Sequence, residues 1–447
     1  MGAMARIQPF SAYRYDLSHV RAADVITQPY DKITPDMRQR YLAQSPYNLV
    51  RIILGEKHEG DDEHNNVYTR ARGHLNDWIQ KGILRADSEP GIYAYSQSFA
   101  APDTGEHVVR RGFIALGGIE DYANQVVFRH EQTLSGPKAD RRALLQATRT
   151  HFGQVFMLYS DPSQATEAEL LARAQNPIFE ATDEYGTTHR LFRETDGAVI
   201  ARLQDHMAAQ KLVIADGHHR YETALQWRNE QNGNAPHRSD HPWNWVMMTF
   251  INADAPGLVV LPTHRLIYGL TGWDAAAVTS KLQQYFDIEP LPGISLKPGN
   301  AAEVWTALRP LLAAAGAGTP AIAMVLQGTS HPSLLRPKPS LDLTALLPDA
   351  SPEQRRLNLV ILHRLALDLG LGITPEMVRE ERHLRYLRSA AEALESVAVG
   401  AGQAAFLVNA IPAAQVREVA LAGGVMPQKS TDFFPKLLTG LTMYRVE

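Results

Sequence analysis

Apolar and polar positions follow two different periods along this chain, and the clearest change of period lies between residues 211 and 228. Residues 211–215 form a short, mostly apolar run with two β-branched members, which is typical of a buried strand. Asp216 and Gly217 interrupt the run. From His218 onward, apolar positions recur every three or four residues. The pattern therefore predicts a strand, a glycine turn and a helix.

The same two periods predict elements on both sides of this unit. They are a buried strand over residues 49–54, a long helix over 67–79, a hairpin over 93–100 and 108–117, and a helix over 139–150. From about residue 272, helices alternate with connections rich in Pro, Gly and Ala. We therefore expect an α+β fold with a mixed sheet core. An N-terminal region would span residues 4–270, and a helix-rich α/β region would span 271–447.

Composition narrows the class of protein. With 447 residues, 45% of them hydrophobic and 21% charged, the chain is typical of globular proteins and too long for one ordinary core. The formal net charge of −4 gives no broad basic surface, so we expect no nucleic-acid partner. The absence of cysteine excludes disulfides, thiol catalysis and cysteine-ligated zinc. Without a signal peptide or a membrane-spanning run, we expect a cytoplasmic protein with no membrane partner.

The turn at residues 216–220 carries the densest chemistry. A glycine turn lets the backbone approach a ligand, and the first N–H groups of a helix point at it, so this arrangement is typical of an anion site. His218, His219 and Arg220 lie where the helix dipole repels cations, which costs stability unless an anion binds. The alternatives are a histidine-rich surface turn, or a metal site that adds Asp216. Adjacent histidines on a helix diverge by about 100°, which disfavours joint ligation.

Other cations follow predicted elements. Lys138 and Arg142 lie on the polar side of the helix around residues 139–150, where they would form a second cationic wall for a phosphate. The alternative is a solvated basic helix face. Arg265 follows a predicted strand in the sequence Pro-Thr-His-Arg and adds a further cation at a strand end.

Carboxylates follow two predicted strands. Glu131, preceded by His130, and Asp31 would each stand at a strand end, where a carboxylate can accept a proton or hold Mg²⁺. We prefer Glu131 as the base, with His130 holding it in place. Glu131 could instead form an ordinary salt bridge with Arg141 or Arg142.

Seven regions resemble one known family. They are PYDKI at residues 29–33, SPYNLVRIILG at 45–55, RRGFIAL at 110–116, HEQTLSGPKADR at 130–141, ADGHHRYETA at 215–224, LPTHR at 261–265, and MPQKST with FFPKLLTGL at 426–441. Over nearly its whole length the chain resembles the family labelled domain of unknown function 1015. Lys32 and Gln428 depart from the usual valine and second proline. The box from Asp216 to Ala224 is also similar to the phosphate-binding box of the ParB/sulfiredoxin-like fold, which includes nucleotide-dependent enzymes, CTP-binding switches and a kinase of free serine.

These observations lead to the hypothesis of a phosphoryl-transfer enzyme that acts on a hydroxyl of a small metabolite. Free L-serine is the first candidate acceptor, ATP, ADP or pyrophosphate the donor, and Mg²⁺ the expected cofactor. The expected phosphate and substrate residues are Asp216, Gly217, His218, His219, Arg220, Lys138, Arg142 and Arg265, and the expected catalytic residues are Glu131, Asp31 and His130.

Two other hypotheses remain open. A metal-dependent hydrolase would use Asp216, His218, His130 and His264 as ligands. A nucleotide-sensing regulatory module would bind the phosphates without turnover. The sequence leaves the oligomeric state open, a homodimer included.

Overall fold

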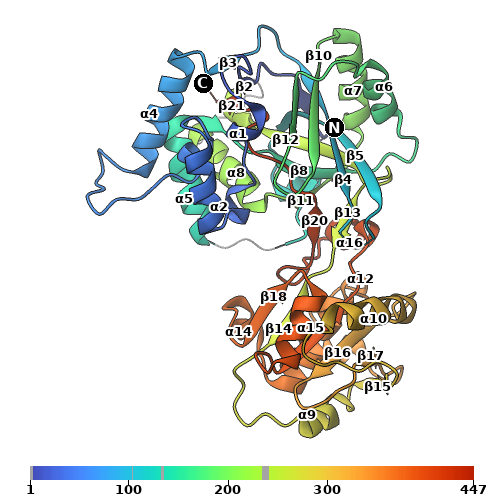
Figure 1. Ribbon diagram of the computed structural model, residues 1–447. Helices are drawn as coiled ribbons and strands as arrows, with labels where there is room; N and C mark the ends of the chain where they lie inside the picture. The colour runs from blue at the N-terminus through green and yellow to red at the C-terminus, as the bar shows by residue number, and fades with distance from the viewer. Residues whose placement is uncertain (1–3, 103, 132–134, 234–240, 447) are drawn as a thin grey trace. The chain divides into compact units, whose positions relative to one another are not determined.

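The computed structural model describes residues 4–102, 104–131, 135–233 and 241–446, which form two compact units (Figure 1). Unit 1 consists of Met1–Arg129, Thr133–Val259 and Pro435–Glu447, and unit 2 of His130–Gln132 and Val260–Phe434. The chain therefore enters unit 2 briefly near residue 130, returns, and ends in unit 1.

Unit 1 combines a large sheet with helices. Its strands are β1 (Ile7–Gln8), β2 (Tyr13–Tyr15), β3 (Leu84–Ala86), β4 (Ile92–Ala100), β5 (His107–Gly118), β6 (Val127–Phe128), β7 (Thr150–His151), β8 (Val155–Tyr159), β9 (Phe179–Thr182), β10 (Thr188–Glu194), β11 (Leu212–Asp216), β12 (Trp245–Asn252) and β21 (Tyr444–Arg445). Its helices are α1 (Ala22–Val25), α2 (Pro35–Gln44), α3 (Val50–Ile53), α4 (Val67–Gln80), α5 (Ser135–Thr148), α6 (Ala165–Arg173), α7 (Gly197–Ala208) and α8 (His218–Asn232), with the 3₁₀ turns η1 (Tyr30–Lys32), η2 (Tyr122–Asn124) and η3 (Pro242–Asn244).

The main sheet of unit 1 is mixed. Its strands run in the order β6, β11, β8, β12, β5, β4, β10 and β9, with β1 added beside β5. The pairs β11–β6 and β12–β8 are parallel, whereas β11–β8, β12–β5 and β4–β5 are antiparallel. Strand β11, which carries the glycine turn at its end, therefore lies inside the sheet rather than at its edge.

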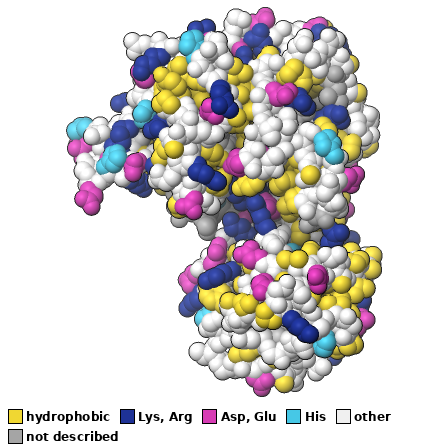
Figure 2. All heavy atoms as spheres, in the orientation of Figure 1, with side chains coloured by type: hydrophobic (Ala, Val, Ile, Leu, Met, Phe, Trp, Pro, Cys, Tyr) yellow, Lys and Arg dark blue, Asp and Glu magenta, His cyan; other side chains and the backbone are white. Residues whose placement is uncertain are grey.

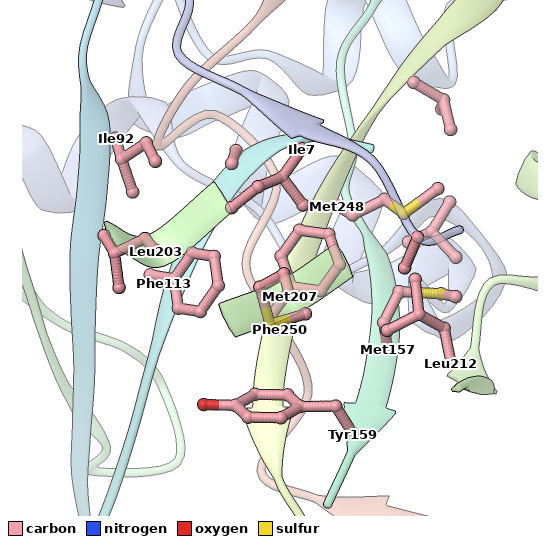
Figure 3. Packing of buried hydrophobic residues seen from close by; sticks show 14 of the residues in the cluster. Ile7, Ile92, Phe113, Met157, Tyr159, Leu203, Met207, Leu212, Met248 and Phe250 are labelled. Carbon is pink, nitrogen blue, oxygen red and sulfur yellow. The ribbon is translucent and has the colours of Figure 1, made fainter. Parts of the chain in front are cut away.

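The core of unit 1 follows the period of two expected for strands. Alternate side chains of β8 and β12 enter one buried cluster, and α7 covers them with side chains at helical spacing. The cluster includes Ile7, Ile92, Phe113, Met157, Tyr159, Leu203, Met207, Leu212, Met248 and Phe250 (Figure 3). Burying each such side chain contributes roughly 1.5–3 kcal/mol, so this cluster anchors β11 firmly.

Unit 2 has an antiparallel sheet of its own. Its strands are β14 (His264–Ile267), β15 (Phe286–Pro290), β16 (Ile322–Leu326), β17 (Ser333–Pro337), β18 (Leu384–Leu387) and β19 (Ala404–Val408), in the order β15, β17, β16, β19, β14, β18. A separate ribbon pairs β13 (Val259–Leu261) with β20 (Asp432–Phe434).

The helices of unit 2 supply one side of its core. They are α9 (Ala275–Leu282), α10 (Ala301–Ala315), α11 (Leu343–Leu346), α12 (Pro352–Arg355), α13 (Asn358–Ile361), the π-helical η4 (Leu362–Gly370), α14 (Pro375–Arg379), α15 (Ala390–Ala398) and α16 (Ala413–Leu421). Val304, Leu308 and Leu312 of α10 follow the helical period and pack in one cluster with the sheet. Because both units join a sheet to helices and the larger sheet is mixed, the α+β prediction is confirmed.

The strand prediction for residues 49–54 is wrong, because Val50–Ile53 forms the helix α3. The side chain of Asn48 accepts a hydrogen bond from the Val50 N–H at 3.0 Å and so starts the turn. Val50, Ile52 and Ile53 are all buried, and the one partly exposed polar residue of the helix, Arg51, is too little to show a helical period.

Two predicted strand ends are also different in the structure. Asp31 lies in the 3₁₀ turn η1 instead of following a strand. Arg265 lies within β14, where it is fully buried. The prolines at positions 29 and 262 do interrupt the chain, as expected for a residue without a backbone N–H, but a new element begins directly after Pro29 and two residues after Pro262.

Over the described ranges, no helix is long and apolar enough to cross a membrane. Acidic and basic side chains are interspersed over the visible face of each unit (Figure 2). Positive charge that matters for a ligand must therefore be sought in local clusters.

Candidate anion-binding site

The junction of β11 and α8 has the geometry that the sequence predicts. Gly217 has φ 91° and ψ 27°, a left-handed conformation that glycine adopts without the steric cost of a side chain. A Cβ atom at this position would lie 3.0 Å from the guanidinium of Arg220. Glycine is therefore required twice, once for the turn and once for the close approach of Arg220.

Asp216 ends β11 and is surrounded by cations. Lys436 Nζ donates to Oδ2 of Asp216 at 2.7 Å, and Arg220 Nη2 lies 3.6 Å from Oδ1. Burial by itself raises the pKa of Asp216, but Lys436, Arg220 and Lys32 hold that pKa well below its usual range. Three cations therefore converge on one ionised carboxylate at the start of a helix.

A fourth cation lies in the same field. Arg110 of β5 is almost completely buried, with its guanidinium 4.9 Å from the ring of Phe156. It donates to Gln97 Oε1 and to the carbonyl of Pro435. Burial lowers the pKa of Arg110 to about 10, while the negative charge of Asp216 raises it. The arginine remains a cation at neutral pH and adds to the positive potential around Asp216.

Lys138 and Arg142 are placed differently from each other. Lys138 Nζ donates to Glu222 at 3.0 Å, in the second turn of α8 and near the Gly217 turn. Arg142 pairs at 2.8 Å with Glu230, which lies 12 residues beyond His218, or about 18 Å along the helix axis. The structure thus brings Lys138, but not Arg142, close to the start of α8.

The remaining predicted residues of unit 1 are near the turn. His218 is buried and His219 partly buried in the first turn of α8. Asp31 is exposed beside Tyr30. Burial and then Asp31 raise the pKa of Tyr30, whereas Arg141 and Arg220 lower it. Because the Asp31 carboxylate and the Arg220 guanidinium both shift the pKa of Tyr30, the two groups belong to one local electrostatic environment.

Three predicted residues meet in unit 2 instead. His130 accepts the Met426 N–H through its carbonyl at 2.8 Å, and its Nε2 lies 3.0 Å from Thr431 Oγ1. Glu131 Oε1 accepts the Lys429 N–H at 3.4 Å. Arg265 Nη2 donates to the carbonyls of Gln428 and Lys429, each at 3.3 Å. These residues hold the loop 426–431, which we call the brace loop.

Sequence reasoning missed Lys436 and Arg110 as site residues. Both lie in stretches recognised from the sequence, FFPKLLTGL and RRGFIAL, but neither follows a predicted turn. Lys436 is 220 residues from Asp216 along the chain, so only the fold brings the two together. A lysine flanked by proline and leucines was the available signal, because a buried charge in such a setting needs a partner.

The candidate groups differ in their fit to a metal ion. Among the described residues, no group of three or more His, Asp or Glu side chains is placed to hold a metal. Asp216 does not suit Mg²⁺, since three cations already compete for its carboxylate. The exposed carboxylate of Asp31 does suit it, because Mg²⁺ is commonly held by one or two carboxylates together with substrate phosphates.

The fold and the site define an α+β protein with a cation-rich strand–glycine–helix turn. The chain belongs to the family described as protein of unknown function (DUF1015), whose model matches residues 7–360. This confirms the family resemblance stated above. No curated protein matches the chain.

Several solved structures are similar to part of the chain. A conserved hypothetical protein from Pyrococcus furiosus is 13% identical, with a TM-score of 0.33 and coverage of 70% of this chain and 89% of that one. A free serine kinase in complex with AMP is 14% identical, with a TM-score of 0.35 and coverage of 72% and 88%. C-terminally truncated SbnI from Staphylococcus aureus is 10% identical, with a TM-score of 0.34 and coverage of 73% and 85%. These values are too low to transfer an activity to this chain.

Proposed function

We propose that this protein is a phosphotransferase that binds the phosphates of a nucleotide or pyrophosphate at the Gly217 turn. The convergence of Arg220, Lys32 and Lys436 on Asp216 carries this proposal. These cations lie at the N-terminus of a 15-residue helix, where the helix dipole disfavours them and favours an anion. Phosphoryl transfer requires mainly positioning and positive charge on the transferring oxygens, and this turn supplies both.

The acceptor in this proposal is a small hydroxylated metabolite, with free L-serine the first to test. Its hydroxyl oxygen attacks the terminal phosphorus, the bond from phosphorus to the bridging oxygen breaks, and the shortened donor leaves. A carboxylate takes the hydroxyl proton. Asp31 is our first choice for this carboxylate in unit 1, because Asp31 and Arg220 both shift the pKa of Tyr30. Glu131 lies in unit 2, where it accepts the Lys429 N–H, so we assign it no role at the Gly217 turn.

Mg²⁺ would be held by Asp31 and the donor phosphates, and would neutralise charge on the phosphate oxygens. Holding the metal and accepting the proton are alternative roles for Asp31. Lys138, which donates to Glu222 near the start of α8, would add positive charge beside the donor phosphates.

Two experiments test the proposal. Calorimetric titration with ATP, ADP and pyrophosphate measures donor binding, and ³¹P NMR of mixtures containing L-serine and other hydroxylated metabolites detects phosphoryl transfer. Arg220→Lys keeps the charge but loses the planar fork, so donor affinity should fall roughly 10- to 100-fold, which corresponds to about 1.5–3 kcal/mol. Arg142→Lys is the matched control, because the exposed side chain of Arg142 pairs with Glu230. The affinity of this variant for the donor should stay unchanged.

Three results would redirect the proposal. Unchanged donor affinity in Arg220→Lys would remove Arg220 from the phosphate site. Tight nucleotide binding without product would favour the sensing module. Hydrolysis that depends on a bound transition metal would favour the metal-dependent hydrolase.

A further inference from the structure

Unit 1 contains a pocket of about 60 Å³ beside the start of α8. Segments far apart in the sequence meet around it, since Tyr30, Arg141, Arg220 and Thr439 all contribute. The full lining is Pro29, Tyr30, Ile53, Arg141, Leu144, Leu145, Thr150, His151, Phe152, Gly153, Arg220, Thr223 and Thr439. The pocket thus combines two guanidinium groups, several hydroxyls and an apolar wall.

The charge of this lining has one sign. Two arginines contribute, and none of the described lining residues is an aspartate or glutamate. The side chains of Arg141 and Arg220 are only 10% and 15% exposed, so water screens their charges incompletely. Asp140 pairs with Arg141, and Asp216 lies 3.6 Å from Arg220, but neither carboxylate lines the pocket. The charge that faces the pocket is therefore positive, which favours an anionic ligand.

Both guanidinium groups keep donors for a ligand. Arg141 donates to Oδ2 of Asp140 through Nε at 2.8 Å and also through Nη2, which leaves Nη1 for a ligand, and its Cζ lies 4.1 Å above the Tyr30 ring. Arg220 Nη1 donates to the Gln154 carbonyl, and its Nη2 is 3.6 Å from Asp216, beyond hydrogen-bond distance. Because a guanidinium has five N–H donors, each group can still bind a carboxylate.

Thr223 provides a second, independent observation. Its side chain lies three residues after Arg220 on α8, lines the pocket and is 4% exposed. Its Oγ1 is buried and has no hydrogen-bond partner among the described residues. An unsatisfied buried hydroxyl costs free energy, so a ligand oxygen at this place would be favourable.

The size of the pocket limits the ligand. Since one water needs roughly 10–15 Å³ of such volume, the pocket has room for about four to six non-hydrogen groups. A carboxylate already occupies three of them. The remainder suits about one to three further atoms against the apolar wall formed by Leu144, Leu145 and Phe152.

We propose that this pocket binds a short organic acid through Arg141 and Arg220, and that the phosphoryl acceptor is a hydroxylated carboxylic acid of two or three carbons. This inference rests on the proposed function for its catalytic meaning, because Arg220 belongs to both the pocket and the Gly217 turn. The planar forks of the arginines suit a carboxylate, and the apolar wall suits its carbon atoms.

Calorimetric titration of the full chain with propionate, without any phosphate donor, tests the pocket. Propionate should bind one to one, while the neutral amide propionamide should bind at least tenfold more weakly. Arg141→Gln should weaken propionate binding at least tenfold. Arg142→Gln removes the same charge from the next residue of α5, away from the pocket, and should bind like the parent.

A second variant keeps both arginines. A Cβ at Gly153 would lie 3.3 Å from Arg220 Nη1 and 3.7 Å from Thr439 Oγ1, so Gly153→Ala should narrow the pocket and weaken propionate binding without a change of charge. Equal binding of propionate and propionamide, or parent-like binding by both Arg141→Gln and Gly153→Ala, would overturn the inference. Inorganic phosphate that binds here more tightly than propionate, with the same dependence on Arg141, would also overturn it.

The two proposals can fail separately. Propionate binding that depends on Arg141, without phosphoryl transfer to any hydroxy acid, would keep the pocket and reject the phosphotransferase. Phosphoryl transfer to an uncharged alcohol, together with no propionate binding, would keep the phosphotransferase and reject the pocket.

Discussion

Each unit buries an arginine that the sequence marked as a candidate phosphate ligand, but the surroundings of the two arginines differ. Arg220 in unit 1 lies below a glycine turn, beside a carboxylate and in the wall of a pocket. Arg265 in unit 2 donates to the carbonyls of Thr263, Gln428 and Lys429 and to Nε2 of His363, and lies over the ring of Tyr386. The described partners of Arg265 are therefore all neutral.

This difference distinguishes an arginine that can bind a ligand, Arg220, from one that fixes a loop, Arg265. Arg265 uses most of its donors on backbone carbonyls, so we interpret it as a residue that fixes the brace loop. That loop needs fixing because Lys429 has φ 55°, a left-handed conformation that costs energy for a residue with a side chain. Arg220 keeps donors directed at a pocket, as a ligand-binding arginine must.

The largest expected effect compares the carboxylates of the two units. Asp31→Asn should reduce turnover roughly 100- to 10,000-fold, because it removes the proton acceptor. Donor affinity should change little if Asp31 is the base, and should fall as well if Asp31 holds the metal. Glu131→Gln should have a smaller effect, since the amide oxygen can still accept the Lys429 N–H. Steady-state kinetics and donor titration of both variants provide the measurement. An active Asp31→Asn beside an inactive Glu131→Gln would reject Asp31 as the base.

The next largest effect concerns stability. Arg265→Met should lower the free energy of unfolding by about 3 kcal/mol, because the carbonyls of Thr263, Gln428 and Lys429 lose their donor. Arg385→Met is the matched control, since Arg385 is exposed and only covers the ring of Tyr268. Urea unfolding monitored by fluorescence compares the two variants. If Arg265→Met keeps its stability but loses donor affinity, Arg265 is a ligand and not a brace.

The sequence was sufficient for the turn of unit 1, because the change of period at Asp216 and the following Gly217 are local signals. It was insufficient for Lys436, since a contact over 220 residues leaves no local trace. It also could not separate Arg141 from Arg142. Neighbouring residues on a helix point about 100° apart, so one enters the pocket and the other pairs with Glu230, but the direction of the pocket depends on the tertiary fold.

The carboxylates and cations of unit 2 illustrate a second limit. His130, Arg265 and the loop 426–431 were separate signals in the sequence, and their convergence requires β14 to be buried beside the brace loop. The strand expected at residues 49–54 failed for the opposite reason, because a short segment with Arg51 as its one polar residue is too apolar to show a helical period.

A smaller effect isolates the contact between Gly217 and Arg220. Gly217→Ala should destabilise unit 1 by about 1–2 kcal/mol through its left-handed φ alone, and should also displace Arg220 and weaken donor binding. Gly186→Ala introduces the same strain at φ 78°, with nothing within 4 Å of the new Cβ, so it should lower stability and leave donor binding unchanged. Thermal unfolding and donor titration measure the two effects. Equal donor affinity in both variants would show that the position of Arg220 does not matter for binding.

The smallest expected effect compares buried histidines of the two units. In unit 2, His264 is 1% exposed and its Nδ1 accepts the Val408 N–H at 3.3 Å. Burial, and then Arg265, lower the pKa of His264 to about 3. In unit 1, burial also lowers the pKa of His189, but Asp183 at 3.2 Å opposes the shift. His264 therefore stays neutral in the folded protein. Asp183 lowers the free-energy cost of protonating His189.

The sign of the pH dependence follows from these shifts. In the unfolded chain a histidine takes up a proton below about pH 6.5, whereas folded His264 stays neutral until the pH approaches 3. The stability that neutral His264 contributes is therefore complete above pH 6.5 and is lost as the pH falls toward 3. The loss should be about 1 kcal/mol between pH 6.5 and 5.5. Urea unfolding of the parent, His264→Phe and His189→Phe at pH 7.5, 6.5 and 5.5 measures it. His264→Phe should be less stable than the parent at pH 7.5, since no acceptor remains for Val408, but it should lose less stability on acidification. His189→Phe should flatten the pH dependence less, because Asp183 already offsets part of the shift. A larger flattening in His189→Phe would mean that the carboxylate in unit 1 does not protect its histidine, and would remove this distinction between the units.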